Sequence, residues 1–120
     1  MQQPDAAPRL WIKIYFGDRG QIGPGKIRLL QGIAEHRSIA ATARAMEMSY
    51  RRAWLLVDQM NKTFGAPVVE THTGGNDRGG AELTPLGTEI VARYQELLDQ
   101  AQAQSEGKLG ELAGLIRPED

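Results

Sequence analysis

Residues 24–64 contain three short stretches with helical apolar spacing, separated by residues that typically end or begin a helix. The first stretch begins near Pro24, and proline is favoured in the first turn of a helix. Ser38 and Ser49 each precede one of the other two stretches, and serine is a preferred N-cap residue. Helices of this length bury too little apolar surface singly, so the pattern predicts a small core made of three packed helices.

The third predicted helix, residues 50–64, has two chemically different sides. At about 100° per residue, one side is expected to face the core and carries Tyr50, Ala53, Trp54, Val57, Met60, Asn61 and Phe64. The other side is expected to point away from the core and carries Arg51, Arg52, Leu55, Asp58, Gln59 and Lys62. The pattern therefore predicts that the aromatic residues anchor this helix and hold the two adjacent arginines outward.

Strand patterns lie on both sides of the helices. Residues 10–16 alternate and are rich in β-branched and aromatic residues, which favours a strand. Residues 17–26 are dense in glycine and proline, and we expect them to form the loop that leads into the first helix. Residues 68–73 and 81–84 are predicted as the two strands of a hairpin with a glycine-rich tip.

A longer helix is predicted after the hairpin. The pair Thr84-Pro85 is typical of a helix start, and the glycines after Ser105 are expected to interrupt the helix. Its apolar stripe consists of Leu86, Ile90, Tyr94, Leu97, Leu98 and Ala101. A small core cannot cover the whole stripe, so we expect two copies of the chain to pair along it as a homodimer.

The order of strand, three helices, hairpin and long helix is that of a winged helix-turn-helix. The predicted fold class is α+β, mainly α, with an N-terminal strand and a long C-terminal dimerisation helix. We expect a flexible tail at 1–8, a DNA-binding domain at 9–84, and a C-terminal helix and tail at 85–120.

The charges are unevenly divided along the chain. Residues 1–80 carry 11 Lys+Arg against 7 Asp+Glu, a net charge of +4, whereas residues 81–120 carry 3 against 8, a net charge of −5. A basic front part is typical of a protein that contacts a polyanion, and the predicted fold makes double-stranded DNA the expected partner.

Composition excludes several other classes. There is no cysteine, which rules out disulfides and thiolate metal sites and fits a reducing cytoplasm. The first residues do not resemble a secretory signal, and no apolar run approaches the roughly 20 residues of a membrane span. The only histidines are His36 and His72, without carboxylates at ligand spacing, so neither a metal site nor a cofactor is expected.

Several motifs together resemble a known family. The stretch "KIRLLQGIAEHRSIAATARAMEMSYRRAWLLVDQMN", the glycine-rich hairpin and "LTPLG" are similar to the N-terminal DNA-binding domain of the ModE family of molybdate-responsive transcriptional regulators. That domain is itself related to the LysR-type regulators. The resemblance covers about residues 9–105 and implies a homodimeric regulator of molybdenum-related operons. ModE regulators continue into a molybdate-binding domain that this chain lacks, so molybdate binding by this chain is not expected.

Candidate DNA contacts follow from the position of residues in a winged helix-turn-helix. The third helix enters the major groove, where arginine is the commonest partner of guanine. Helix N-termini bind phosphate, and a basic wing reaches the minor groove or the backbone. The candidate residues are Ser38, Thr42, Ser49, Arg51, Arg52, Leu55, Gln59, Lys62 and Arg78.

Two features of the sequence would favour functions other than DNA binding. An outward Leu55–Leu56 pair would favour a winged-helix adaptor that acts through protein contacts or pairs with a full-length sensor.

Residues 20–26 fit the phosphate-loop pattern G-x-x-x-x-G-K, but Ile27 follows where a magnesium-binding hydroxyl is needed. Nucleotide hydrolysis is therefore not expected, and no other catalytic arrangement indicates an enzyme.

Overall fold

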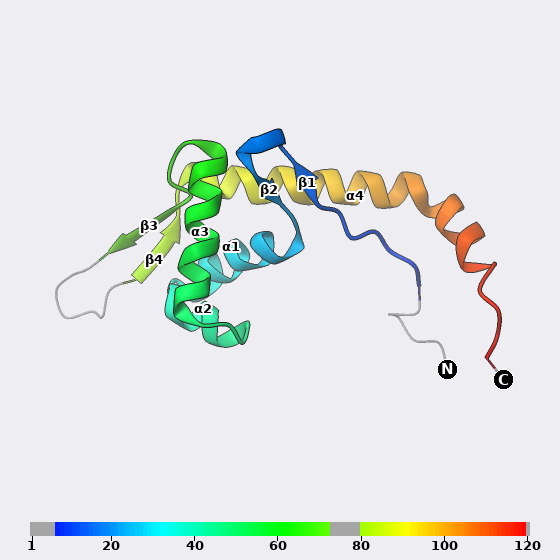
Figure 1. Cartoon of the computed structure of the whole chain (residues 1–120), viewed down its shortest axis with the longest axis horizontal. Helices are drawn as coiled ribbons and strands as arrows, with labels where there is room; N and C mark the ends of the chain where they lie inside the picture. Colours follow the sequence, from blue (N-terminus) through cyan, green and yellow to red (C-terminus); the bar gives the residue numbers. More distant parts are fainter. Residues whose placement is uncertain (1–6, 73–79, 120) are drawn as a thin grey trace.

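Three short helices pack beside a β-hairpin, and a fourth, much longer helix leaves this core along the long axis of the molecule (Figure 1). The computed structural model describes residues 7–72 and 80–119. In chain order, its elements are β1 (Ile14–Tyr15), a 3-10 helix (Gly17–Arg19), β2 (Gln21–Ile22), α1 (Pro24–His36), α2 (Ile39–Ala45), α3 (Tyr50–Phe64), β3 (Val69–His72), β4 (Gly80–Leu83) and α4 (Pro85–Ala113). This mainly helical α+β architecture is consistent with the predicted winged helix-turn-helix.

The helix starts lie where the sequence predicted them. Pro24 is in the first turn of α1. The Ser38 hydroxyl accepts a hydrogen bond from the N–H of Ala41, and the Ser49 hydroxyl accepts one from the N–H of Arg52. Both bonds satisfy N–H groups that have no partner within the helix.

The core lies where α1, α2 and α3 meet. Its largest fully buried side chains are Leu29, Leu30, Ile33, Met60, Val57, Val68 and Thr42. Gly32 of α1 lies so close to Thr42 of α2 that an added Cβ would collide with the threonine methyl group. The close approach of α1 and α2 therefore requires glycine at position 32.

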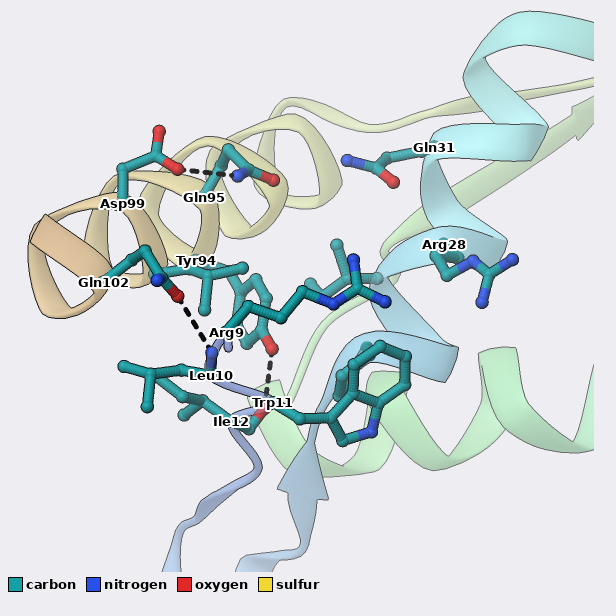
Figure 2. A pocket seen from close by; sticks show the side chains of 13 residues that line it. Arg9, Leu10, Trp11, Ile12, Arg28, Gln31, Tyr94, Gln95, Asp99 and Gln102 are labelled. Carbon is teal, nitrogen blue, oxygen red and sulfur yellow. Dashed lines mark hydrogen bonds between the residues drawn. The ribbon is translucent and has the colours of Figure 1, made fainter. Parts of the chain in front are cut away.

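The N-terminal strand is much shorter than predicted. Only Ile14 and Tyr15 pair with a strand, and the partner strand β2 lies inside the segment predicted to be a loop. Before Ile14 the chain runs along α4 instead (Figure 2). There the N–H of Leu10 donates to Gln102 Oε1 at 2.8 Å, and the Tyr94 hydroxyl donates to the carbonyl of Ile12 at 2.6 Å. Side chains of α4 thus replace the strand partner that the alternating pattern suggested.

The hairpin is antiparallel, with Val69 opposite Leu83 and His72 opposite Gly80. It is joined to α1 through β4. The N–H of Ala81 donates to the carbonyl of Arg37 at the end of α1, which ties β4 to that helix. The predicted strands are confirmed, and the glycine-rich tip lies outside the described residues.

Helix α4 is continuous from Pro85 to Ala113, so the predicted interruption after Ser105 is wrong. Gly107 and Gly110 each cost roughly 1 kcal/mol relative to alanine. Good helix formers surround them, and the Lys108 ammonium lies 3.1 Å from the Glu111 carboxylate. The extended helix gives the chain a radius of gyration of 17.7 Å, whereas a compact domain of this length has about 14 Å. None of the described helices has the length and apolar character needed to cross a membrane.

Candidate nucleic-acid interface

The outward side of α3 carries the polar residues that the helical spacing assigned to it. Arg51, Arg52, Leu55, Asp58, Gln59 and Lys62 are all exposed. The opposite side is anchored by Ala53, Val57 and Met60, which have exposed fractions of 0–1%. Because the anchoring residues cannot shift without opening the core, the backbone that carries the arginines is held in a fixed orientation.

Tyr50 departs from the prediction, because it is 55% exposed rather than buried. Its ring packs edge-on against the half-buried Trp54, with 6.5 Å between the ring centroids. The first residues of α3, from Tyr50 to Arg52, are all exposed, so this turn extends beyond the packed core. Helical spacing predicts the side on which a residue lies, but it does not predict where the core ends.

The two leucines of α3 have different environments. Leu55 is 47% exposed, as its position on the polar side predicted, but Leu56 is only 9% exposed and belongs to the core. The outward leucine pair is therefore absent, and with it the feature that favoured a protein-binding adaptor. Leu55 lies in a shallow depression on the polar side of α3, which Ser49, Arg51, Arg52, Trp54 and Asp58 also line.

The residues predicted to approach phosphate differ in accessibility. Ser49 is exposed and Ser38 is half-buried. Thr42 is fully buried, and its hydroxyl donates to the carbonyl of Ser38 at 2.7 Å. A phosphate cannot reach this hydroxyl, so Thr42 supports the packing of α2 and is removed from the set of candidate contacts.

Lys62 has a partner within its own helix. Its ammonium lies 3.3 Å from the Asp58 carboxylate, one turn earlier, and both side chains are largely exposed. Such exposed pairs contribute little to stability, so Lys62 can exchange this partner for a phosphate at small cost.

The hairpin forms the wing of the fold. Next to its glycine-rich tip, His72 Nε2 lies 2.9 Å from the Glu82 carboxylate. Arg78, the predicted wing contact, lies outside the described residues.

Arg52 has two basic neighbours that the sequence reasoning did not assign to the site. These neighbours are Lys13 and Lys26, and the pKa of the Lys26 ammonium is lowered by burial and by the charges of Lys13 and Arg52. Burial is the larger cause, followed by Lys13 and then Arg52. The G-x-x-x-x-G-K stretch could have indicated Lys26 as an anion-binding residue. No sequence motif connects Lys13 with Lys26 and Arg52.

The predicted dimerisation stripe of α4 is partly used within the chain. Ile90 and Tyr94 have exposed fractions of 6% and 4% and belong to the core, which corrects their assignment to an interface. Leu86, Leu98 and Ala101 are half-buried. Leu97 is 43% exposed, and further along the helix Leu112 is 62% exposed.

Comparison with known proteins identifies relatives of this chain. Residues 25–88 match the family described as bacterial regulatory helix-turn-helix protein, lysR family. The molybdenum-pterin-binding protein MopA of Rhodobacter capsulatus is 37% identical over 99 residues, which are 82% of this chain and 36% of that protein. The molybdenum transport protein ModE of Azotobacter vinelandii is 40% identical over 72 residues, which are 60% of this chain and 27% of the relative.

The DNA-binding transcriptional dual regulator ModE of Escherichia coli is 38% identical over 82 residues, which are 68% of this chain and 31% of that protein. The chain thus spans about a third of the length of these relatives. The family match contains all of α1, α2, α3 and the hairpin, apart from the first residue of α1.

Proposed function

The chain belongs to the LysR family of bacterial regulatory helix-turn-helix proteins and is of the ModE type, and from this premise we propose that two copies of it bind an inverted-repeat DNA operator. Its helix-turn-helix is a DNA-binding domain of a non-enzymatic regulator family. The sequence-specific reading, the homodimer and the regulated genes are the proposal.

The observation that carries the proposal is the placement of Arg51 and Arg52. Both are exposed in the first turn of α3, between Tyr50, which follows the Ser49 cap, and the buried Ala53. The N-terminal part of a recognition helix is the part that contacts base edges in the major groove. An arginine there can donate two hydrogen bonds to O6 and N7 of guanine. We assign base or phosphate contact to Arg51 and Arg52.

The other candidate residues surround these arginines. Gln59 and Lys62 follow on the same exposed side of α3 and would contact the backbone as the helix leaves the groove. Leu55 would pack on a thymine methyl group. Ser38 and Ser49, at the N-termini of α2 and α3, would approach phosphates, and Arg78 would bind from the wing.

We assign dimerisation to the outer part of α4. Leu97 and Leu112 lie on one side of this helix, about 60° apart at 100° per residue, and both are exposed. Burial of apolar surface contributes about 25 cal/mol per Å², so pairing of two such helices is favourable. A two-fold dimer presents its two α3 helices to half-sites one DNA turn apart, or a multiple of it, which requires an inverted repeat.

The names of the relatives suggest which genes this chain regulates. Two of the relatives are named for molybdenum transport or molybdenum-pterin binding, so we propose that the operator lies near molybdenum-related genes. The chain would act in the cytoplasm, where bacterial DNA lies.

Selection of bound sequences from random duplexes tests the proposal. The expected result is an enriched inverted repeat whose half-sites contain guanine at a fixed position. Repetition of the selection with molybdate present shows whether that ion affects binding. Enrichment of no sequence at low salt would contradict the assignment of sequence-specific reading to α3.

A further inference from the structure

A basic pocket lies between the N-terminus of α1 and the start of α3. Its volume is about 340 Å³, and its lining includes Lys13, Gln21, Gly25, Lys26 and Arg52. The pocket contains the end of the G-x-x-x-x-G-K stretch, so this motif forms part of a hollow rather than a plain connecting loop. The hollow is distinct from the depression around Leu55 on the polar side of α3, although Arg52 borders both.

Positive charges converge on this pocket from three different elements of the chain. Lys13 precedes β1 and packs on Gly23, because a Cβ added to that glycine would meet Lys13 Cγ at 3.4 Å. Lys26 belongs to α1, and its ammonium donates to the carbonyl of Gln21 at 2.9 Å. Arg52 reaches the pocket from α3. No carboxylate lines the pocket, and among the described residues none of these three cations forms an ion pair.

The proximity of the three cations is unfavourable while no anion is bound. Burial first, and then Lys13 and Arg52, lower the pKa of Lys26, which means that its charged form is disfavoured in this environment. An anion in the pocket would reduce the mutual repulsion and favour the charged form of Lys26. The electrostatics of the pocket therefore favour an anionic ligand.

The backbone N–H groups at the N-terminus of α1 also favour an anionic ligand. Helix α1 begins with Gly23 as its N-cap, and no side chain caps it. Pro24 has no N–H group, and the first intrahelical bond of α1 is donated by Ile27 to Gly23. The N–H groups of Gly25 and Lys26 thus have no acceptor within the described part of the chain. Free N–H groups at a helix N-terminus bind phosphate and similar oxyanions.

Gln21 contributes an uncharged polar side chain to the pocket lining. Gln21 Oε1 is buried and has no hydrogen-bond partner among the described residues. This oxygen has essentially no accessible surface, so it is not counted among the groups that would contact a ligand. The charged oxygens of a phosphate would accept from the lysine, arginine and backbone N–H groups of the pocket.

We propose that this pocket binds a single phosphate group through Lys13, Lys26, Arg52 and the N–H groups of Gly25 and Lys26. The residue after Lys26 is the buried Ile27, which cannot ligate magnesium, so binding is not coupled to nucleotide hydrolysis. The phosphate comes either from the DNA backbone or from a free oxyanion. Arg52 and Gln59 line the pocket and also lie on the exposed side of α3, which places the phosphate at the border of the DNA-facing surface.

Titration of the full chain with inorganic phosphate tests the pocket itself. Backbone amide resonances are followed by NMR at constant ionic strength, with chloride as the reference anion. Phosphate is expected to shift the Gly25 and Lys26 resonances selectively. The shifts should fall several-fold in Lys13→Gln and in Lys26→Gln. Lys108→Gln, a change of the same charge on the exposed far end of α4, should leave them unchanged.

A second titration with duplex DNA identifies the source of the phosphate, and its interpretation rests on the proposed function. A backbone phosphate in the pocket predicts that Lys13→Gln reduces the slope of log K against log salt by about 0.9 for the lost contact. A selective shift with inorganic phosphate and an unchanged slope identifies a free oxyanion. A shift with DNA alone identifies the backbone.

Absence of a selective shift with both inorganic phosphate and DNA overturns the pocket assignment. Binding of inorganic phosphate by a chain that binds no duplex contradicts the proposed function and supports the pocket. The two failures are therefore distinguishable.

Discussion

The Ser49 hydroxyl accepts a hydrogen bond from the backbone N–H of Arg52, with 2.9 Å between the two heavy atoms. The bond fixes the first turn of α3, and this turn carries both arginines of the candidate interface. A single side chain therefore defines where the helix begins and how the arginines are presented. Ser49 is therefore expected to affect both the stability of the fold and the proposed DNA contacts of Arg51 and Arg52.

Replacement of Ser49 separates these two roles. Ser49→Ala removes the cap and is expected to lower the free energy of unfolding by about 0.5–2 kcal/mol. Ser49→Asp keeps an acceptor at the N-cap and should retain the stability, but its negative charge would repel DNA phosphates. Urea unfolding and duplex binding, measured side by side, check this. Undiminished DNA affinity in Ser49→Asp would argue against a DNA-facing first turn.

The contact between α4 and the hairpin leaves no room for a side chain at Gly87. An added Cβ would collide with the backbone carbonyl of Val68. Gly87→Ala is therefore expected to lower the free energy of unfolding by on the order of 1–3 kcal/mol. Gly107→Ala is the matched control, because nothing lies within 4 Å of its added Cβ. This variant should be more stable by roughly 0.5–1 kcal/mol. Equal effects of the two changes on denaturant midpoints would contradict the packing.

The bond from the Tyr94 hydroxyl to Ile12 holds the N-terminal segment on α4. Tyr94→Phe is expected to cost about 0.5–1.5 kcal/mol. Burial raises the pKa of Tyr94 above its ordinary value of 10.0. The neutral phenol is therefore favoured in the folded chain, and its contribution is complete below pH 10 and lost as pH rises through the folded pKa. Alkaline unfolding curves should show this loss in the wild type and a smaller loss in Tyr94→Phe.

The proposed dimer depends on the outer part of α4. The double change Leu97→Glu with Leu112→Glu should convert dimers to monomers in sedimentation equilibrium without loss of helix content, since both side chains are exposed. Ala103→Glu places one glutamate on another exposed side of α4 and should leave the dimer intact. A wild-type chain that stays monomeric at high concentration would refute the dimer.

Local signals predicted most of this fold. N-cap residues and apolar spacing predicted the three short helices, and alternation on both sides of a glycine-rich tip predicted the hairpin. These elements were predictable because their signals lie within short stretches of neighbouring residues. The N-terminal segment was predicted less well, since residues of α4 such as Gln102 and Tyr94 take the place of a strand. A tertiary contact of this kind has no signature in a short stretch of sequence.

In the candidate site, too, some features were predictable from neighbouring residues and others depend on tertiary contacts. The outward direction of Arg51 and Arg52 follows from helical spacing, and the structure agrees with it. The burial of Thr42 depends on the close approach of Gly32, and the exposure of Tyr50 depends on where the core ends. The approach of Lys13 to Lys26 and Arg52 joins three distant segments, so it became visible only in the folded chain.

The most direct test of the account is a comparison of the wild type with Arg51→Ala and Arg52→Ala on the duplex obtained by selection. Fluorescence anisotropy at several salt concentrations gives the affinities for this duplex and for a scrambled one. Loss of a base contact should cost about 1–3 kcal/mol on the selected duplex in at least one variant and relax its preference over the scrambled duplex. Arg93→Ala, on the exposed surface of α4, serves as the control of equal charge. Wild-type affinity in both α3 variants, or no detectable duplex binding by the wild type at low salt, would contradict the assignment of DNA reading to α3.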